Sequence, residues 1–112
     1  MMTMTTIHVR DDLVKTLRLF GDAESVVSDA LKRYAIQQCI ERIDQAVNKA
    51  KAYEARYKCD YQTFSTRVQT DDDFLRTVEA VNPTWEEDAM EWKMRLREVE
   101  TWTKRLEDTL RK

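Results

Sequence analysis

The segment Thr5-Thr6-Ile7-His8-Val9-Arg10 (residues 5–10) decides the fold that we expect for this chain. Its side chains alternate in character, with Ile7 and Val9 facing one side and polar residues facing the other, which is the pattern of a β-strand. A single strand cannot pair its own backbone N–H and C=O groups, and the sequence offers no second convincing strand. We therefore expect this strand to pair with the same strand of a second copy, in a two-stranded antiparallel ribbon.

Two helical patterns follow the strand. Asp11 or Asp12 is expected to cap the first helix, which ends at Gly21 because glycine readily adopts positive φ. Asp22 is expected to cap the second helix, which continues to about Tyr57 because no Gly or Pro interrupts it. The core expected for this block consists of Ile7, Val9, Leu13, Leu17, Phe20, Val27, Leu31 and Tyr34.

The rest of the chain carries two heptad patterns, over residues 36–57 and 85–110. In both, apolar residues recur alternately four and three positions apart, with few polar interruptions. Two such helices joined by a connection predict an antiparallel helical hairpin. The expected hairpin core contains Ile36, Ile40, Ile43, Val47, Trp85, Trp92, Leu96 and Val99.

Short helices are expected in the connection. Asp60 is a candidate cap for one of them, and Thr70–Asp73 has the composition of a second helix start. The Asn82-Pro83 pair ends that second helix, because proline disfavours helical geometry in the residue before it. Thr84 and Glu87 then match the capping box at the start of the last helix.

Composition excludes several classes of protein. One Gly and one Pro in 112 residues are too few for the turns of a β-sandwich or barrel. The formal charge of −2 excludes a broad polycationic binder, and no apolar run is long enough to span a membrane. The N-terminus lacks a signal pattern, and Cys39 and Cys59 fit two reduced thiols, so we expect a cytoplasmic protein. With no nucleophile–base pair, phosphate loop or metal-ligand spacing, we expect neither enzyme activity nor a cofactor.

Residues 5–35 resemble the ribbon-helix-helix family of DNA-binding proteins. The stretches that carry the resemblance are TIHV, DLVKTLRLF and FGDAESVVSDALKRY, which supply strand, helix, glycine turn and helix in order. The resemblance implies an intertwined homodimer whose ribbon enters the DNA major groove. It places Thr6 and His8, with Met4 and Arg10 at the ends, against the bases, and Ser25 at a phosphate clamp. The alternative for Thr6 and His8 is exposure to solvent without a ligand, and the alternative for Arg10 is a weak exposed pair with Asp11 or Asp12 of either chain.

Short proteins of this family also resemble antitoxins of bacterial toxin–antitoxin pairs. The resemblance implies that residues 1–35 dimerise and bind operator DNA, while the helical arm of residues 36–112 binds a toxin protein. The expected function is therefore an antitoxin-like transcriptional regulator. In the arm, Tyr61, Phe64 and Trp102 are the candidate contacts to a protein partner, and core packing is the alternative for tryptophans near the heptad line.

A different class of function is favoured by the charges of the N-terminal block. Asp22 and Glu24 would repel a phosphate at the clamp, and residues 1–36 carry five basic and five acidic side chains. These features favour a dimeric helical scaffold, or adaptor, that uses the ribbon only to dimerise. The predicted fold class is the same for both functions: mainly α, with an N-terminal ribbon-helix-helix followed by a long helical hairpin.

Overall fold

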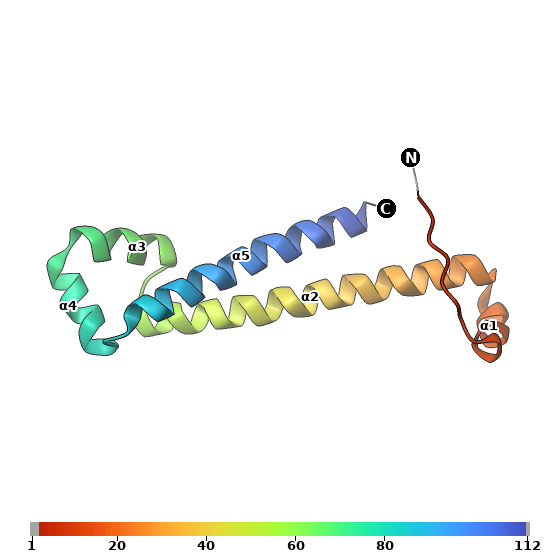
Figure 1. Cartoon of the computed structure of the whole chain (residues 1–112), viewed down its shortest axis with the longest axis horizontal. Coiled ribbons are helices and arrows are strands. Elements are labelled where there is room, and N and C mark those ends of the chain that lie inside the picture. The colour runs from red at the N-terminus through yellow and green to blue at the C-terminus, as the bar shows by residue number, and fades with distance from the viewer. Residues whose placement is uncertain (1–2, 112) are drawn as a thin grey trace. The chain divides into compact units, whose positions relative to one another are not determined.

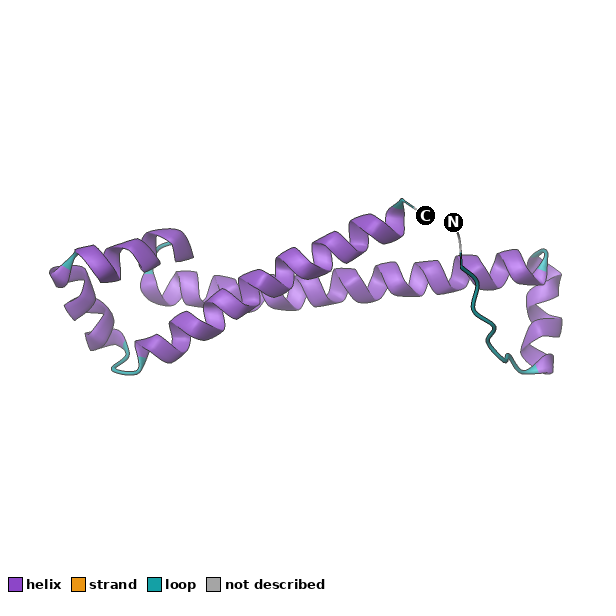
Figure 2. Ribbon diagram, turned by 45° about the horizontal axis from the view of Figure 1, so that its top comes forward, coloured by secondary structure: helices purple, strands orange, loops and turns teal. Residues whose placement is uncertain are grey.

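A computed structural model describes residues 3–111 of the chain, which are almost entirely helical (Figure 2). The chain forms two compact units divided between Ala35 and Ile36. We call residues 3–35 the N-terminal unit and residues 36–111 the hairpin unit. The elements are α1 (Asp11–Leu17), a 3-10 turn (Arg18–Phe20), α2 (Ala23–Tyr57), α3 (Tyr61–Thr70), α4 (Asp72–Val81) and α5 (Trp85–Leu110).

The β-strand that we predicted at residues 5–10 is wrong. No strand occurs among residues 3–111, and the chain from Thr3 to Arg10 is exposed coil. At Arg10 the backbone is extended, with φ −59° and ψ 137°, immediately before α1 begins. Alternation alone does not make a strand, because the backbone groups need a partner edge and no other part of the described chain supplies one. The ribbon-helix-helix fold, which requires that strand, is overturned with it.

The helices themselves follow the sequence closely. The second helix runs from Ala23 to Tyr57 as expected, and the first ends before Gly21, whose φ of 145° is accessible to few other residues. The side chain of Asp22 accepts a hydrogen bond from the Ser25 backbone N–H at 3.2 Å, which confirms it as a cap.

The connection is capped by aspartates, again as predicted. Asp60 accepts from the Thr63 backbone N–H at 2.7 Å, and Asp71 accepts from that of Phe74 at 3.1 Å. The capping box expected at Thr84 is wrong, because the Thr84 hydroxyl donates to the Asn82 side chain at 2.9 Å instead of binding the helix that follows. The Asn82 side chain therefore holds the turn before the last helix, because it accepts from both the backbone N–H and the hydroxyl of Thr84.

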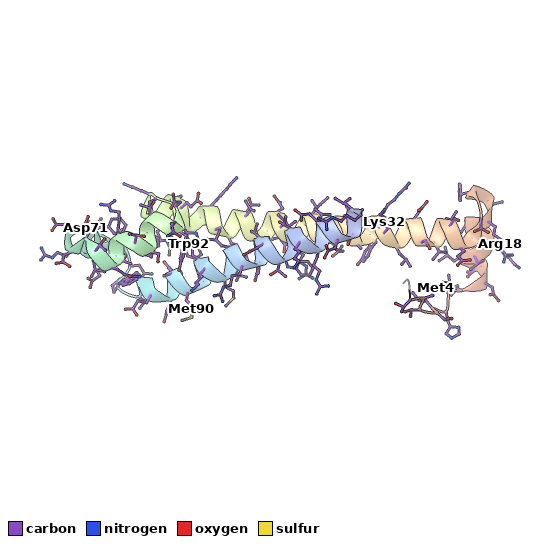
Figure 3. All side chains as sticks on the ribbon, turned by 90° about the horizontal axis from the view of Figure 1, so that it is seen from above. Met4, Arg18, Lys32, Asp71, Met90 and Trp92 are labelled. Atoms are coloured by element: carbon purple, nitrogen blue, oxygen red, sulfur yellow. The ribbon has the colours of Figure 1, made fainter. Side chains whose placement is uncertain are left out.

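The hairpin unit has an aromatic core at its closed end. Residues 36–57 of α2 and the antiparallel α5 lie side by side, and α3 and α4 pack across the end where they join (Figure 1). Trp92, labelled in Figure 3, lies on α5. It is fully buried, and its ring centroid is 5.3 Å from that of Phe64. Tyr57 packs on Phe64 at 4.8 Å, and Val78 of α4 closes the cluster.

The predicted cores are only partly right. Trp92 is confirmed as a core residue of the hairpin, but Ile40 and Leu96 are 52% and 37% exposed. The buried positions of α2 include Cys39 and Ala46, which are the residues directly before Ile40 and Val47. In the N-terminal unit, no residue of the predicted core is buried within the single chain: Leu17 and Val27 are half-buried and the others are exposed.

Candidate interaction surfaces

The N-terminal unit exposes the side chains that would normally form a core. They range from 36% exposed at Val9 to 83% at Met4. Monomeric proteins seldom leave so many large apolar side chains uncovered on so short a segment. The eight residues are Met4, Ile7, Val9, Leu13, Leu19, Phe20, Leu31 and Tyr34.

An open groove of about 840 Å³ crosses this unit. The coil contributes residues 4–9, and α2 contributes Val27 and Leu31. The lining is mainly apolar, with Glu24 as its charged member. Its shape and chemistry suit apolar side chains of another protein segment better than a charged ligand.

The residues expected at DNA are all exposed but are not arranged as a clamp. Met4, Thr6 and His8 lie along the coil at the groove, while Arg10 is paired with Asp12 at 2.9 Å in an exposed ion pair. The hydroxyl of Ser25 donates to Asp22 at 3.3 Å, as the Ser25 backbone N–H also does. A phosphate would bind at the N-terminus of α2, but the Ser25 N–H there is already bonded to a carboxylate of the chain itself.

In the hairpin unit, α2 and α5 are joined by a polar network that we call the clasp: Tyr53, Arg56 and Tyr57 of α2 with Asp88 and Glu91 of α5. The hydroxyls of Tyr53 and Tyr57 donate to Glu91 and Asp88, each at 2.5 Å. Arg56 pairs with Asp88 at 2.7 Å. The spacing of these partners matches one turn on each helix, so the clasp fixes the register of the hairpin.

Two residues outside the clasp complete its hydrogen bonds. The Asn82 side-chain amide donates to Asp88 at 3.0 Å, and Arg95 pairs with Glu91 at 2.9 Å. Asp88, whose side chain is 14% exposed, thereby accepts from three different side chains. All three donors bond Oδ2 of Asp88, and together they favour the ionised form of this carboxylate.

The clasp shifts the pKa values of its members. Burial and the bond to Glu91 raise the pKa of Tyr53 to about 12, and burial with the bond to Asp88 raises that of Tyr57. Partial burial works against ionisation of Asp88, but its donors outweigh this and hold its pKa below the usual range. The hydrogen bonds from Tyr53 and then Arg95 lower the pKa of Glu91.

A groove of about 400 Å³ lies beside the clasp, lined by Lys49, Ala52 and clasp side chains. Its polar walls are already bonded to each other across the two helices. The chemistry that this arrangement supports is the holding of α2 against α5.

The three residues expected to bind a partner differ in accessibility. Phe64 is 1% exposed and belongs to the core. Tyr61 is half-buried, edge-on to Trp92 at 5.3 Å. Trp102 is half-buried under the Arg42 guanidinium, at 5.5 Å from the ring centroid. The structure does not bring these three into one surface patch.

The sequence did not indicate the clasp. Tyr53, Arg56 and Asp88 lie off the heptad lines that we followed, and a pairing over more than thirty residues requires the register of the hairpin. One signal was present: tyrosines four apart in α2 and acids three apart in α5 mark matching faces of two helices.

Within residues 3–111, no helix is long and apolar enough to cross a membrane, and no three potential metal ligands gather. No family model matches the chain, and neither the curated proteins nor the solved structures contain a similar one.

Proposed function

We propose that the chain is a dimeric helical scaffold, without catalytic activity, whose N-terminal unit joins two copies and whose hairpin unit presents a rigid surface to other proteins. The observation that carries this proposal is the missing core of the N-terminal unit. About 33 residues with no buried side chain cannot hold a fold alone, since small chains already bury too little surface. A partner surface would supply what is missing.

The exposed apolar area is sufficient for a dimer. An aromatic side chain carries roughly 150–250 Å² and an aliphatic one less, and the eight residues are 36–83% exposed, so together they offer on the order of 1,000 Å² at most. A standard stable interface needs about 800 Å² from each partner. Two copies of the same unit also do not repel each other, because its five basic and five acidic residues cancel.

An antitoxin-like regulator is the second candidate function. Exposure of Thr6 and His8 on one coil favours it, since both side chains can reach DNA, whereas Arg10 is paired with Asp12. Against it stand Asp22 at the N-terminus of α2 and the neutral charge of the unit, which give little attraction for phosphates. The balance favours the scaffold.

Sedimentation equilibrium on the full chain tests the proposal. The wild type is expected to be a dimer at micromolar concentration. The double variant Leu19→Glu/Phe20→Glu places charges on side chains that are 81% and 75% exposed, and it should be a monomer with helicity retained. The matched control Met90→Glu, at a 69% exposed site of α5, should remain a dimer. A monomeric wild type overturns the proposal.

A gel shift with the DNA upstream of the coding sequence separates the two functions. No binding at low salt by the dimer supports the scaffold. Salt-sensitive binding that Thr6→Ala/His8→Ala abolishes supports the regulator and refutes the scaffold as the main function.

A further inference from the structure

The hairpin unit is unevenly packed along its length. At the closed end, Trp92, Phe64 and Val78 are each less than 2% exposed. Residues 36–47 of α2 and 96–110 of α5, which we call the open half, bury only Cys39 and Ala46. The reason is architectural, because α3 and α4 cover only the closed end (Figure 1). The open half is a bare two-helix layer.

The open half nevertheless carries large apolar side chains in heptad spacing. On α2, Ile40 is 52% exposed, and on α5, Leu96 and Leu110 are 37% and 57% exposed. Their neighbours on the same lines are half-buried. The members of the two lines are Ile36, Ile40, Ile43 and Val47 on α2, and Leu96, Val99, Thr103, Leu106 and Leu110 on α5.

These two lines lie on the same face of the hairpin. On α2, Ile40 directly follows buried Cys39, and Val47 directly follows buried Ala46. Each is therefore rotated about the helix axis by about 100° from the buried side of α2, in the N-to-C sense. On α5, Thr103 follows Trp102, whose ring lies under Arg42 of α2, in the same way, and Leu96 lies one heptad before Thr103. Since the helices are antiparallel, the same sense of rotation brings both sets to one side.

We propose that this face packs against the same face of a second copy, so that two hairpins form a four-helix bundle. Helices with heptad-spaced apolar residues pack with helices of the same spacing, and each copy supplies two of them with matched length. A twofold axis makes such a face complementary to itself. The rim carries both signs of charge, with Asp44 and Lys51 on α2 and Lys93 and Glu100 on α5.

The size of the face also favours a second copy over an unrelated protein. Two helices about 10 Å wide over roughly 18 Å give on the order of 400 Å², half of what a free partner needs. A copy already joined through the N-terminal unit is present at an effective concentration of about millimolar, where so small a face is enough. In this respect the inference rests on the proposed function.

The test compares two apolar sites of nearly equal exposure, one on the proposed face and one off it. Ile40 lies on the proposed face and Met94 lies on the outer side of α5, with exposures of 52% and 51%. In the full chain, Ile40→Glu should weaken self-association by at least about tenfold, because a charge is buried in each copy. Met94→Glu should change it by less than about twofold. Sedimentation equilibrium gives both constants, and circular dichroism confirms that the variants are helical.

The outcomes separate this inference from the proposed function. Equal constants for Ile40→Glu and Met94→Glu, in a chain that Leu19→Glu/Phe20→Glu makes monomeric, overturn the four-helix bundle alone. A dimer that survives Leu19→Glu/Phe20→Glu and is lost in Ile40→Glu supports the bundle and overturns dimerisation by the N-terminal unit. Where Ile40→Glu does not fold, Ile40→Ser replaces it, with the same expected direction and Met94→Ser as its control.

Discussion

The two units of this chain form helices from the same local signals, but only the hairpin unit has a buried core. The hairpin unit gathers four other buried side chains, aromatic and aliphatic, around Trp92, which is wholly buried. The N-terminal unit has comparable apolar residues, such as Phe20 and Leu31, and buries none of them. Caps and periodicity are therefore enough to specify helices, but a core also needs enough chain to surround it.

The largest loss of stability is expected from removing the side chain at the centre of the hairpin core. Trp92→Ala should lower the free energy of unfolding by about 3–5 kcal/mol, because a large buried ring is replaced by a cavity. The matched change in the other unit, Phe20→Ala at a 75% exposed site, should cost less than about 0.5 kcal/mol within one copy.

Urea denaturation followed by circular dichroism measures both variants. It is done below the concentration at which the chain associates, so that only interactions within one copy count. Equal losses in Trp92→Ala and Phe20→Ala would remove the contrast between the two units.

A second prediction concerns the clasp, which has no counterpart in the N-terminal unit. Asp88→Ala leaves the donors of Tyr57, Arg56 and Asn82 without their acceptor and should cost about 2 kcal/mol. Arg76→Ala, which breaks an exposed ion pair of 3.8 Å with Asp73, should cost less than about 0.5 kcal/mol. The same urea titration measures both free energies of unfolding. A loss in Asp88→Ala as small as that in Arg76→Ala would show that the clasp does not hold the hairpin together.

The smallest expected effect is the dependence of hairpin stability on pH. The pKa values of Asp88 and Glu91 are lowered by folding, so their contribution is present at neutral pH and is lost as the pH falls below their unfolded values near 4. The pKa of Tyr53 is raised to about 12, so its contribution is present below its unfolded value and is lost as the pH rises toward 12.

Urea midpoints measured from about pH 3 to pH 12 check both the acidic and the alkaline limb of the stability profile. Tyr53→Phe should flatten the alkaline limb, and Asp88→Asn should flatten the acidic one. An alkaline limb that is unchanged in Tyr53→Phe would mean that another group produces it.

Much of the secondary structure was predictable because its signals are local. Asp60, Asp71 and Pro83 mark helix ends that depend only on neighbouring residues, and the structure places the ends there. The strand at residues 5–10 was mispredicted because its alternation says nothing about a partner edge. Pairing is a property of two segments, and the sequence shows one.

The hairpin core was mispredicted by a single position for a related reason. Ile40 and Cys39 lie on adjacent heptad lines, and the larger side chain suggested the wrong one. Cys39 and Ala46 are buried while Ile40 is 52% exposed, so the buried side of α2 lies one position before the larger side chain. The clasp between Tyr53 and Glu91 depended on the same register and was missed for that reason.

The placement of the tryptophans in α5 provides a built-in optical probe. Trp85, Trp92 and Trp102 all belong to the hairpin unit, and the N-terminal unit has no tryptophan. Intrinsic fluorescence excited at the indole band therefore reports only on the hairpin. Its emission would shift to the red when Trp92 meets water, whatever the N-terminal unit does, so the opening of one unit can be timed in the unmodified chain independently of the other.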